Sequence, residues 1–292
     1  MDNASSASFL ARHEFLIRRL HSLSGLLPVG AYMVVHLVTN ASVLAGASTF
    51  QSNVDSIHSL GPALPLVEWT FIFLPIIFHA VVGVWIIRSG LPNTANYAYK
   101  GNIRYTLQRA TAWIALAFIF WHVFHMHGWI HNDAFMKNVS KPLFGAQFDW
   151  QHATSSAAAA LAPLTAKIIY AIGMLSCVYH FANGLWTMGI TWGLWITPAS
   201  QRRADYLCTT LGVLLAVVGL GALYGMSSAD RLGAVAIEDA RIDQKAELDQ
   251  KAAKIKKKLE QDQARDATTQ TPGSATRAPG LERPAAQTAL RP

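Results

Sequence analysis

Charge is scarce in this sequence, and most of it lies near one end. Only 14% of the 292 residues are Asp, Glu, Lys or Arg, whereas 52% are hydrophobic. Residues 227–292 hold 12 of the 24 basic and 10 of the 17 acidic residues, so the first 226 residues are strongly apolar. So few charges exclude an ordinary soluble domain of this length and predict a membrane protein.

Cysteine chemistry is lacking as well. The two cysteines, Cys177 and Cys208, lie singly in different apolar stretches. Without a CxxCH or a CxxC motif, the sequence offers neither covalent haem attachment nor a cysteine-based zinc or redox site. Both cysteines are therefore predicted to be inert packing residues.

Long apolar runs are what the sequence does have. A helix of about 20 residues crosses the hydrocarbon of a bilayer. Five stretches reach that length and predict an all-α membrane protein with a five-helix transmembrane bundle: 24–46, 66–87, 110–130, 166–190 and 207–226. The first stretch is too long for a secretory signal and has no evident cleavage site, so it is kept as a membrane helix.

Basic residues in the short connections predict the orientation. The N-terminal segment and the second and fourth connections carry nine Lys and Arg, whereas the first connection carries none. The positive-inside rule then places the N-terminus in the cytoplasm and, after five spans, the C-terminal tail outside. We expect a cytoplasmic segment at 1–23, the membrane domain at 24–226 and a tail at 227–292 that is helical and charged before becoming disordered.

Four of the 11 histidines lie well inside separate spans: His36, His79, His122 and His180. Ionisable groups at membrane depth are costly and usually face the bundle interior, where they bind something. The alternative is that each is a neutral histidine hydrogen-bonded to a neighbouring helix. One histidine on each of four helices favours ligands, because cohesion needs only a few polar bonds.

The depths of these histidines divide them into two levels. At ~1.5 Å per residue, His79 and His180 lie ~14 Å from the cytoplasmic boundary, and His36 and His122 lie ~20–25 Å from it. Two facing imidazoles fill both axial positions of one haem iron. Two haems are therefore predicted, with His79 paired to His180 and His36 to His122. Spacing alone leaves His125, one turn after His122, as an alternative ligand.

A repeated frame surrounds two of the histidines, since FHAVVGVW at 78–85 matches YHFANGLW at 179–186. Gly83 and Gly184 follow their histidines by four residues and so share their helix faces, where a missing side chain leaves room for a flat macrocycle. A small-residue helix contact is the alternative for either glycine. Trp85 and Trp186 fit aromatic-belt anchoring at the cytoplasmic interface.

A bare metal site is excluded by the scarcity of carboxylates. Zinc and di-iron sites in helical bundles require carboxylates near their histidines. The acids near the second span, Asp55 and Glu68, both lie toward its outer end. Together with His58 they are instead the nearest ionisable candidates for a quinone site beside the outer haem.

Four blocks closely resemble the single-chain, di-haem cytochrome b anchor of succinate:menaquinone oxidoreductases (succinate dehydrogenases). They are RRLHSLSGLLPVGAYMVVHLV at 18–38, FLPIIFHAVVGVW at 73–85, LQRATAWIALAFIFWHVFH at 107–125 and YHFANGLWTMGITWGLWITPASQR at 179–202. The resemblance runs from about residue 12 to residue 226. Two departures stand out: the tail of about 66 residues has no counterpart in close relatives, and Val178 replaces a glutamate that serves proton passage in some fumarate reductases of the family.

The resemblance implies a respiratory-chain subunit that acts with partners in the bacterial cytoplasmic (inner) membrane. It would tie a flavoprotein and an iron-sulfur subunit to the cytoplasmic face and carry electrons from succinate through two b haems to a quinone, expected to be menaquinone. The family's haem ligands fall on His36, His79, His122 and His180, which favours His122 over His125. We expect lipid and quinone as further partners, no nucleic acid, and no dehydrogenation by this chain alone.

Two other functions stay open. One is the di-haem cytochrome b subunit of a hydrogenase or nitrate reductase, which also holds histidine pairs in a small bundle. The other is a haem-free membrane scaffold or transporter. Copurifying covalent flavin and reduced b-type absorption bands would distinguish the three.

Overall fold

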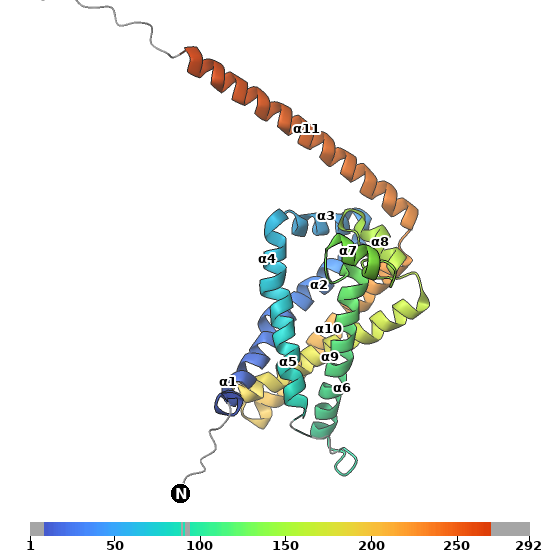
Figure 1. Ribbon diagram of the computed structural model, residues 1–292. Helices are drawn as coiled ribbons and strands as arrows, with labels where there is room; N and C mark the ends of the chain where they lie inside the picture. The colour runs from blue at the N-terminus through green and yellow to red at the C-terminus, as the bar shows by residue number, and fades with distance from the viewer. Residues whose placement is uncertain (1–8, 89, 91–93, 270–292) are drawn as a thin grey trace, which may run out of the picture. The chain divides into compact units, whose positions relative to one another are not determined.

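The computed structural model describes residues 9–88, 90 and 94–269, and all regular secondary structure in these ranges is helical (Figure 1). The predicted all-α membrane fold is confirmed by five helical segments that are long and apolar enough to cross a membrane. They are Arg12–Ala45, Gly61–Arg88, Lys100–His127, Leu164–Thr191 and Pro198–Ser228. Residues 1–8 of the predicted N-terminal segment and 270–292 of the predicted disordered tail lie outside the described residues.

The first two spans each combine several helical stretches. The first consists of α1 (Phe9–Ser24), the wide-turned η1 (Gly25–Gly30), α2 (Ala31–Ala41) and the short η2 (Ser42–Ala45). It begins at Arg12 and not at the predicted 24, because α1 runs directly into η1. The widened turns of η1 accommodate Pro28, which lacks an N–H. The second span continues from η3 (Gly61–Ala63) through α4 (Leu64–Glu68) and η4 (Trp69–Phe73) to α5 (Leu74–Arg88).

The other three spans are more regular. The third comprises α6 (Lys100–His122) and η5 (Val123–His127), and the fourth and fifth are α9 (Leu164–Thr191) and α10 (Pro198–Ser228). The fifth span, α10, begins nine residues before the predicted 207. Thr197 and Ser200 cap each other's backbone there, and Pro198 at the first helical position costs no hydrogen bond.

The fourth span lies at the centre of the bundle. Its helix α9 packs against both α6 and α10, while α10 also packs against α2, and α1 packs against α5 (Figure 1). Large apolar side chains on the outer helix faces are exposed, including Phe71, Val81 and Val217. A bilayer would cover such a surface, since lipid tails are as apolar as these side chains.

Short helices gather at one end of the bundle. They are α3 (Ala47–His58), α7 (Asp133–Phe135), η6 (Met136–Ser140), η7 (Trp150–His152) and α8 (Ala153–Ala160) (Figure 1). We call α3, η7 and α8 together the end cap. Its buried core joins the spans through Phe50, Ala157, Tyr170 and Met226, among others.

The last helix, α11 (Arg231–Thr269), belongs to two compact units. Residues up to Ile242 form one unit with the bundle, and the second unit starts at Asp243. Within the second unit the side chains of residues 243–265 are exposed and largely charged, as a solvated helix requires.

Candidate functional site

A cavity of about 1480 Å³ lies inside the bundle and receives side chains from all five spans. Its volume exceeds the ~300–1,000 Å³ of an ordinary ligand pocket. The wall is mostly apolar, and His36, His79, His122 and His180 all line it. The four histidines singled out from sequence therefore share one internal space.

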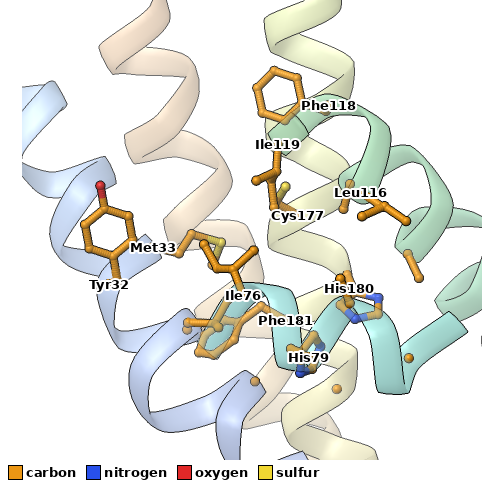
Figure 2. A pocket seen from close by; sticks show the side chains of 18 of the residues that line it. Tyr32, Met33, Ile76, His79, Leu116, Phe118, Ile119, Cys177, His180 and Phe181 are labelled. Atoms are coloured by element: carbon orange, nitrogen blue, oxygen red, sulfur yellow. The ribbon is translucent and has the colours of Figure 1, made fainter. Parts of the chain in front are cut away.

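His79 and His180 face each other from α5 and α9, as Figure 2 shows. Their ring centroids are 6.2 Å apart and the ring planes are nearly perpendicular, at 85°. Nδ1 of His79 is 3.0 Å from the carbonyl oxygen of His21, and Nδ1 of His180 is 3.1 Å from that of Gln108. Because a carbonyl oxygen only accepts, each Nδ1 carries the proton and each Nε2 keeps its lone pair.

His36 and His122 form the second pair, from α2 and α6. Their ring centroids are 5.9 Å apart and the planes meet at 74°. Nδ1 of His122 is 3.1 Å from the hydroxyl of Tyr170, and Nε2 of His36 is 3.1 Å from the amide nitrogen of Asn40. In this pair the two rings are thus fixed through different nitrogens.

The structure brings together the same two pairs that helical depth predicts. His125, the alternative ligand, does not line the cavity. Its ring stacks on Trp121 with centroids 4.6 Å apart, and its Nδ1 is 3.0 Å from the Tyr170 hydroxyl. Tyr170 therefore holds His122 and His125 at once, a role that no pattern in the apolar run around it indicates.

The spacing of the pairs fits a group gripped between two imidazoles. A metal–imidazole bond of ~2.0 Å on each side, plus ~1.1 Å from each nitrogen to its ring centre, separates the centroids by ~6.2 Å. Both observed separations agree with this value. Within the described ranges, no three His, Cys, Asp or Glu side chains gather as a bare metal ion would need. A haem fits such a donor set, since it brings four nitrogens of its own.

A chain of polar groups leads from the surface to the His79/His180 pair. Asp205 accepts from Arg104 at 2.6 Å, and Arg104 donates to the side chain of Asn183 at 2.8 Å. The amide of Asn183 donates in turn to Gln108 at 2.8 Å, and Gln108 donates to the carbonyl of His180 at 3.1 Å. Asn183 is thus buried in an apolar span with both ends of its amide paired.

Cationic side chains line the same end of the cavity. Arg18, Arg19, Arg104 and Arg109 do so, whereas Arg88 is exposed and does not. Three of them lie over tryptophans, with guanidinium-to-ring distances of 5.2 Å from Arg18 to Trp85, 5.1 Å from Arg19 to Trp192 and 3.9 Å from Arg104 to Trp186. These cations are placed to meet anionic groups that enter the cavity there.

Glycines make room at several points of the wall. A Cβ on Gly83 would lie 3.2 Å from the His21 ring, and one on Gly184 would lie 3.4 Å from the Gln108 amide, so both predicted glycines border the cavity beside polar side chains. Gly25 has even less room for a side chain, because a Cβ at this position would overlap the ring of His79. The sequence frame around the histidines does not include it.

Of the three predicted quinone-site residues, only Glu68 lines the cavity, where Tyr32 is another lining residue. Asp55 forms an ion pair with Arg241 at 2.8 Å. His58 stacks on Trp150, with ring centroids 4.7 Å apart. The structure therefore does not bring the three candidates together on the cavity wall.

Comparison with known proteins shows the family of the chain. No protein-family model matches the chain. The succinate dehydrogenase cytochrome b558 subunit of Bacillus subtilis (strain 168) is 38% identical over 211 residues, which cover 72% of this chain and 96% of the relative. An alignment over nearly the whole relative at this identity establishes a common family.

Proposed function

Because the chain belongs to the family of succinate dehydrogenase cytochrome b subunits, we propose that it carries electrons from succinate to a quinone through two b haems. As a multi-pass membrane protein of this family, it serves as the cytochrome b membrane anchor of the complex. The proposed partners are the flavoprotein and iron-sulfur subunits, docked on the cytoplasmic face of a bacterial inner membrane. The N-terminus would lie on that face.

The observation that carries the proposal is the presence of two histidine pairs, each at the spacing of a bis-imidazole site, around one cavity. His79 and His180 would hold one haem, and His36 and His122 the other. When bound, each haem supplies reversible one-electron oxidation and reduction at its iron.

The protein's own part is to orient the ligands and set their surroundings. The carbonyls of His21 and Gln108 fix the rings of His79 and His180 and raise the basicity of their Nε2 atoms. Gly83 and Gly184 would leave space for the macrocycles, and the arginines at the cavity mouth would meet haem propionates. The mostly apolar wall would shield the macrocycles from water.

For the quinone, we propose menaquinone as the substrate and Glu68 as the ionisable group beside it. Glu68 lies on the cavity wall toward the end-cap side and, by its place in the second span, somewhat farther from the cytoplasmic boundary than the His36/His122 pair. A quinone that takes up electrons also needs protons, and a carboxyl beside an apolar slot delivers them. Asp55 and His58 are weaker candidates, because their side chains are engaged away from the cavity.

Copurification tests the proposal. The tagged full-length chain, isolated from membranes, should bring down a subunit with covalent flavin and an iron-sulfur subunit, and succinate should reduce its b-type absorption bands. A hydrogenase or nitrate reductase as the copurifying partner would overturn the assignment of electron donor. A chain without b-type bands would be a haem-free scaffold or transporter.

A further inference from the structure

The first turns of α11 are tied to the end cap by a buried carboxylate. Glu238 is fully buried, at 0% exposure. Its oxygens accept from the backbone N–H of Thr154 at 2.7 Å, from that of Ser155 at 3.2 Å and from the Ser155 hydroxyl at 2.5 Å. Glu238 of α11 thus accepts hydrogen bonds from N–H groups in the first turn of α8 that have no partner within α8 itself.

Two neighbours of Glu238 make further contacts with the cap. Asp239 lies 2.9 Å from Nε2 of His152, and Arg241 donates to Asp55 at 2.8 Å. One α11 turn therefore reaches both η7 and α3.

Inside the cap, Gln51 joins the same elements. It is 2% exposed and donates to Asp55 at 2.9 Å and to the carbonyl of Trp150 at 2.8 Å. Its side-chain oxygen accepts from the backbone of Ala153 at 3.0 Å. The contacts of α11 thus enter a continuous network that links α3 to α8.

The elements held in this way form part of the cavity wall. Phe50 of α3 and Ala157 of α8 line the cavity and share a packed core with Tyr170. The hydroxyl of Tyr170 is bonded to His122. A loosened cap would therefore disturb the surroundings of the His36/His122 pair first.

We propose that Arg231–Ile242 is a clamp that holds the end cap closed over the His36/His122 end of the cavity. Glu238 is its central positioning residue. The clamp gives a structural role to the beginning of a segment whose sequence suggests only a solvated, charged helix. Residues from Asp243 onward are not part of it.

Two truncations of the chain in its complex test the location of the clamp. One ends at Ile242 and keeps the clamp, whereas the other ends at Asp230 and removes it. Hydrogen–deuterium exchange at the amides of Thr154 and Ser155 is the readout. The truncation that ends at Asp230 should accelerate this exchange about tenfold to hundredfold, the range expected when hydrogen bonds to a buried carboxylate are lost. Ending at Ile242 should leave it unchanged, and equal acceleration in both truncations would overturn the proposal.

A pair of matched substitutions tests Glu238 itself. Glu238→Ala should accelerate the same exchange by a similar factor, whereas Glu247→Ala, at an exposed glutamate of the same helix, should not. Asp239→Asn changes a more exposed contact, so the complex that carries it should assemble even if the truncated complex does not. Amide exchange at Thr154 and Ser155 should accelerate less in this variant than in Glu238→Ala. Unchanged exchange in both Glu238→Ala and Asp239→Asn would overturn the proposal.

Carbon monoxide binding to the reduced complex adds a second readout, which rests on the proposed haems. If His36 and His122 hold a haem, a loosened cap should allow carbon monoxide to bind in a fraction of the complexes, for Glu238→Ala but not for Glu247→Ala. The exchange measurement does not depend on haem, so failure of the clamp is distinguishable from failure of the proposed function. If Glu238→Ala accelerates exchange but does not allow carbon monoxide to bind, the clamp stabilises the end cap alone. That result would overturn its proposed link to the His36/His122 pair.

Discussion

Gln108 and His180 are joined by two reciprocal hydrogen bonds. The carbonyl of Gln108 lies 3.1 Å from Nδ1 of His180, and the side-chain amide of Gln108 donates to the carbonyl of His180 at 3.1 Å. The first bond orients the imidazole, and the second fixes the backbone of α9 at the same residue. A displacement of α6 against α9 would therefore move this ring.

This relationship predicts the effect of Gln108→Leu. The backbone carbonyl still accepts from His180. The carbonyl of His180 loses only its second donor, because α9 still bonds it, whereas the side-chain N–H of Asn183 loses its partner. A buried polar group without a partner costs about 1–3 kcal/mol. We expect a less stable complex that still contains b haem, with a shifted reduction potential for one haem. Potentiometric titration measures the shift, and Gln261→Leu, on the exposed part of α11, is the control. Identical potentials in both variants would contradict the positioning role.

Gly25→Ala tests the space around His79. The added methyl group would overlap the His79 ring, which must then leave its position opposite His180. We expect loss of the haem held by this pair, read as the haem content of the purified complex. Gly221→Ala is the matched control, because Gly221 is not part of the cavity wall and a Cβ there would meet only the end of the Leu44 side chain, at 3.3 Å. A full haem complement in Gly25→Ala would show that His79 is not held where the structure places it.

The quinone proposal predicts different effects at its three candidate residues. Glu68→Gln should lower the rate of succinate-to-quinone electron transfer at least about tenfold, since proton transfer by a positioned side chain commonly contributes more than that. Haem content and the reduction of haem by succinate should be unchanged. Asp55→Asn and His58→Gln should keep most of the rate. Undiminished turnover in all three variants would remove these residues from the quinone site.

The contact between His152 and Asp239 predicts a pH dependence of the end cap. The hydrogen bond to Asp239, and then that to Asp149, raise the pKa of His152 above its ordinary value. A group whose pKa is raised on folding stabilises the fold fully below its unfolded pKa of about 6.5, and this contribution is lost as the pH rises through the folded pKa. Intrinsic-rate-corrected amide exchange in α8 should therefore accelerate as the pH rises above about 6.5 and through the raised pKa of His152. In His152→Asn it should not, and the same acceleration in that variant would contradict the assignment.

The number of spans and the pairing of the histidines can be predicted from helix length and rise. The groups that hydrogen-bond to the histidine rings cannot. Apolar length identifies five spans, and the fixed rise of a helix places His79 level with His180 without any knowledge of packing. The partners of these rings come from far along the chain: Gln108 precedes His180 by 72 residues, and His21 precedes His79 by 58. Their backbone carbonyls carry no side-chain signature that a sequence pattern reveals.

Helix ends and the tail show the same limit. The first span starts at Arg12 and not at 24 because α1 continues directly into η1, and α10 starts early because Thr197 and Ser200 cap it. Glu238 looks like one more charge of a solvated helix, and only its contacts with α8 identify it as buried. Each of these features depends on long-range packing or on local backbone geometry, which composition and spacing do not encode.

The haem-to-polypeptide ratio of the purified complex tests the central claim most directly. We predict two b haems per chain in the wild type, one or fewer in His79→Ala, His180→Ala, His36→Ala and His122→Ala, and two in His125→Ala, whose ring lies outside the cavity. One haem per wild-type chain, or none, would contradict two bis-histidine sites. A haem lost from His125→Ala and kept in His122→Ala would contradict the pairing of His36 with His122.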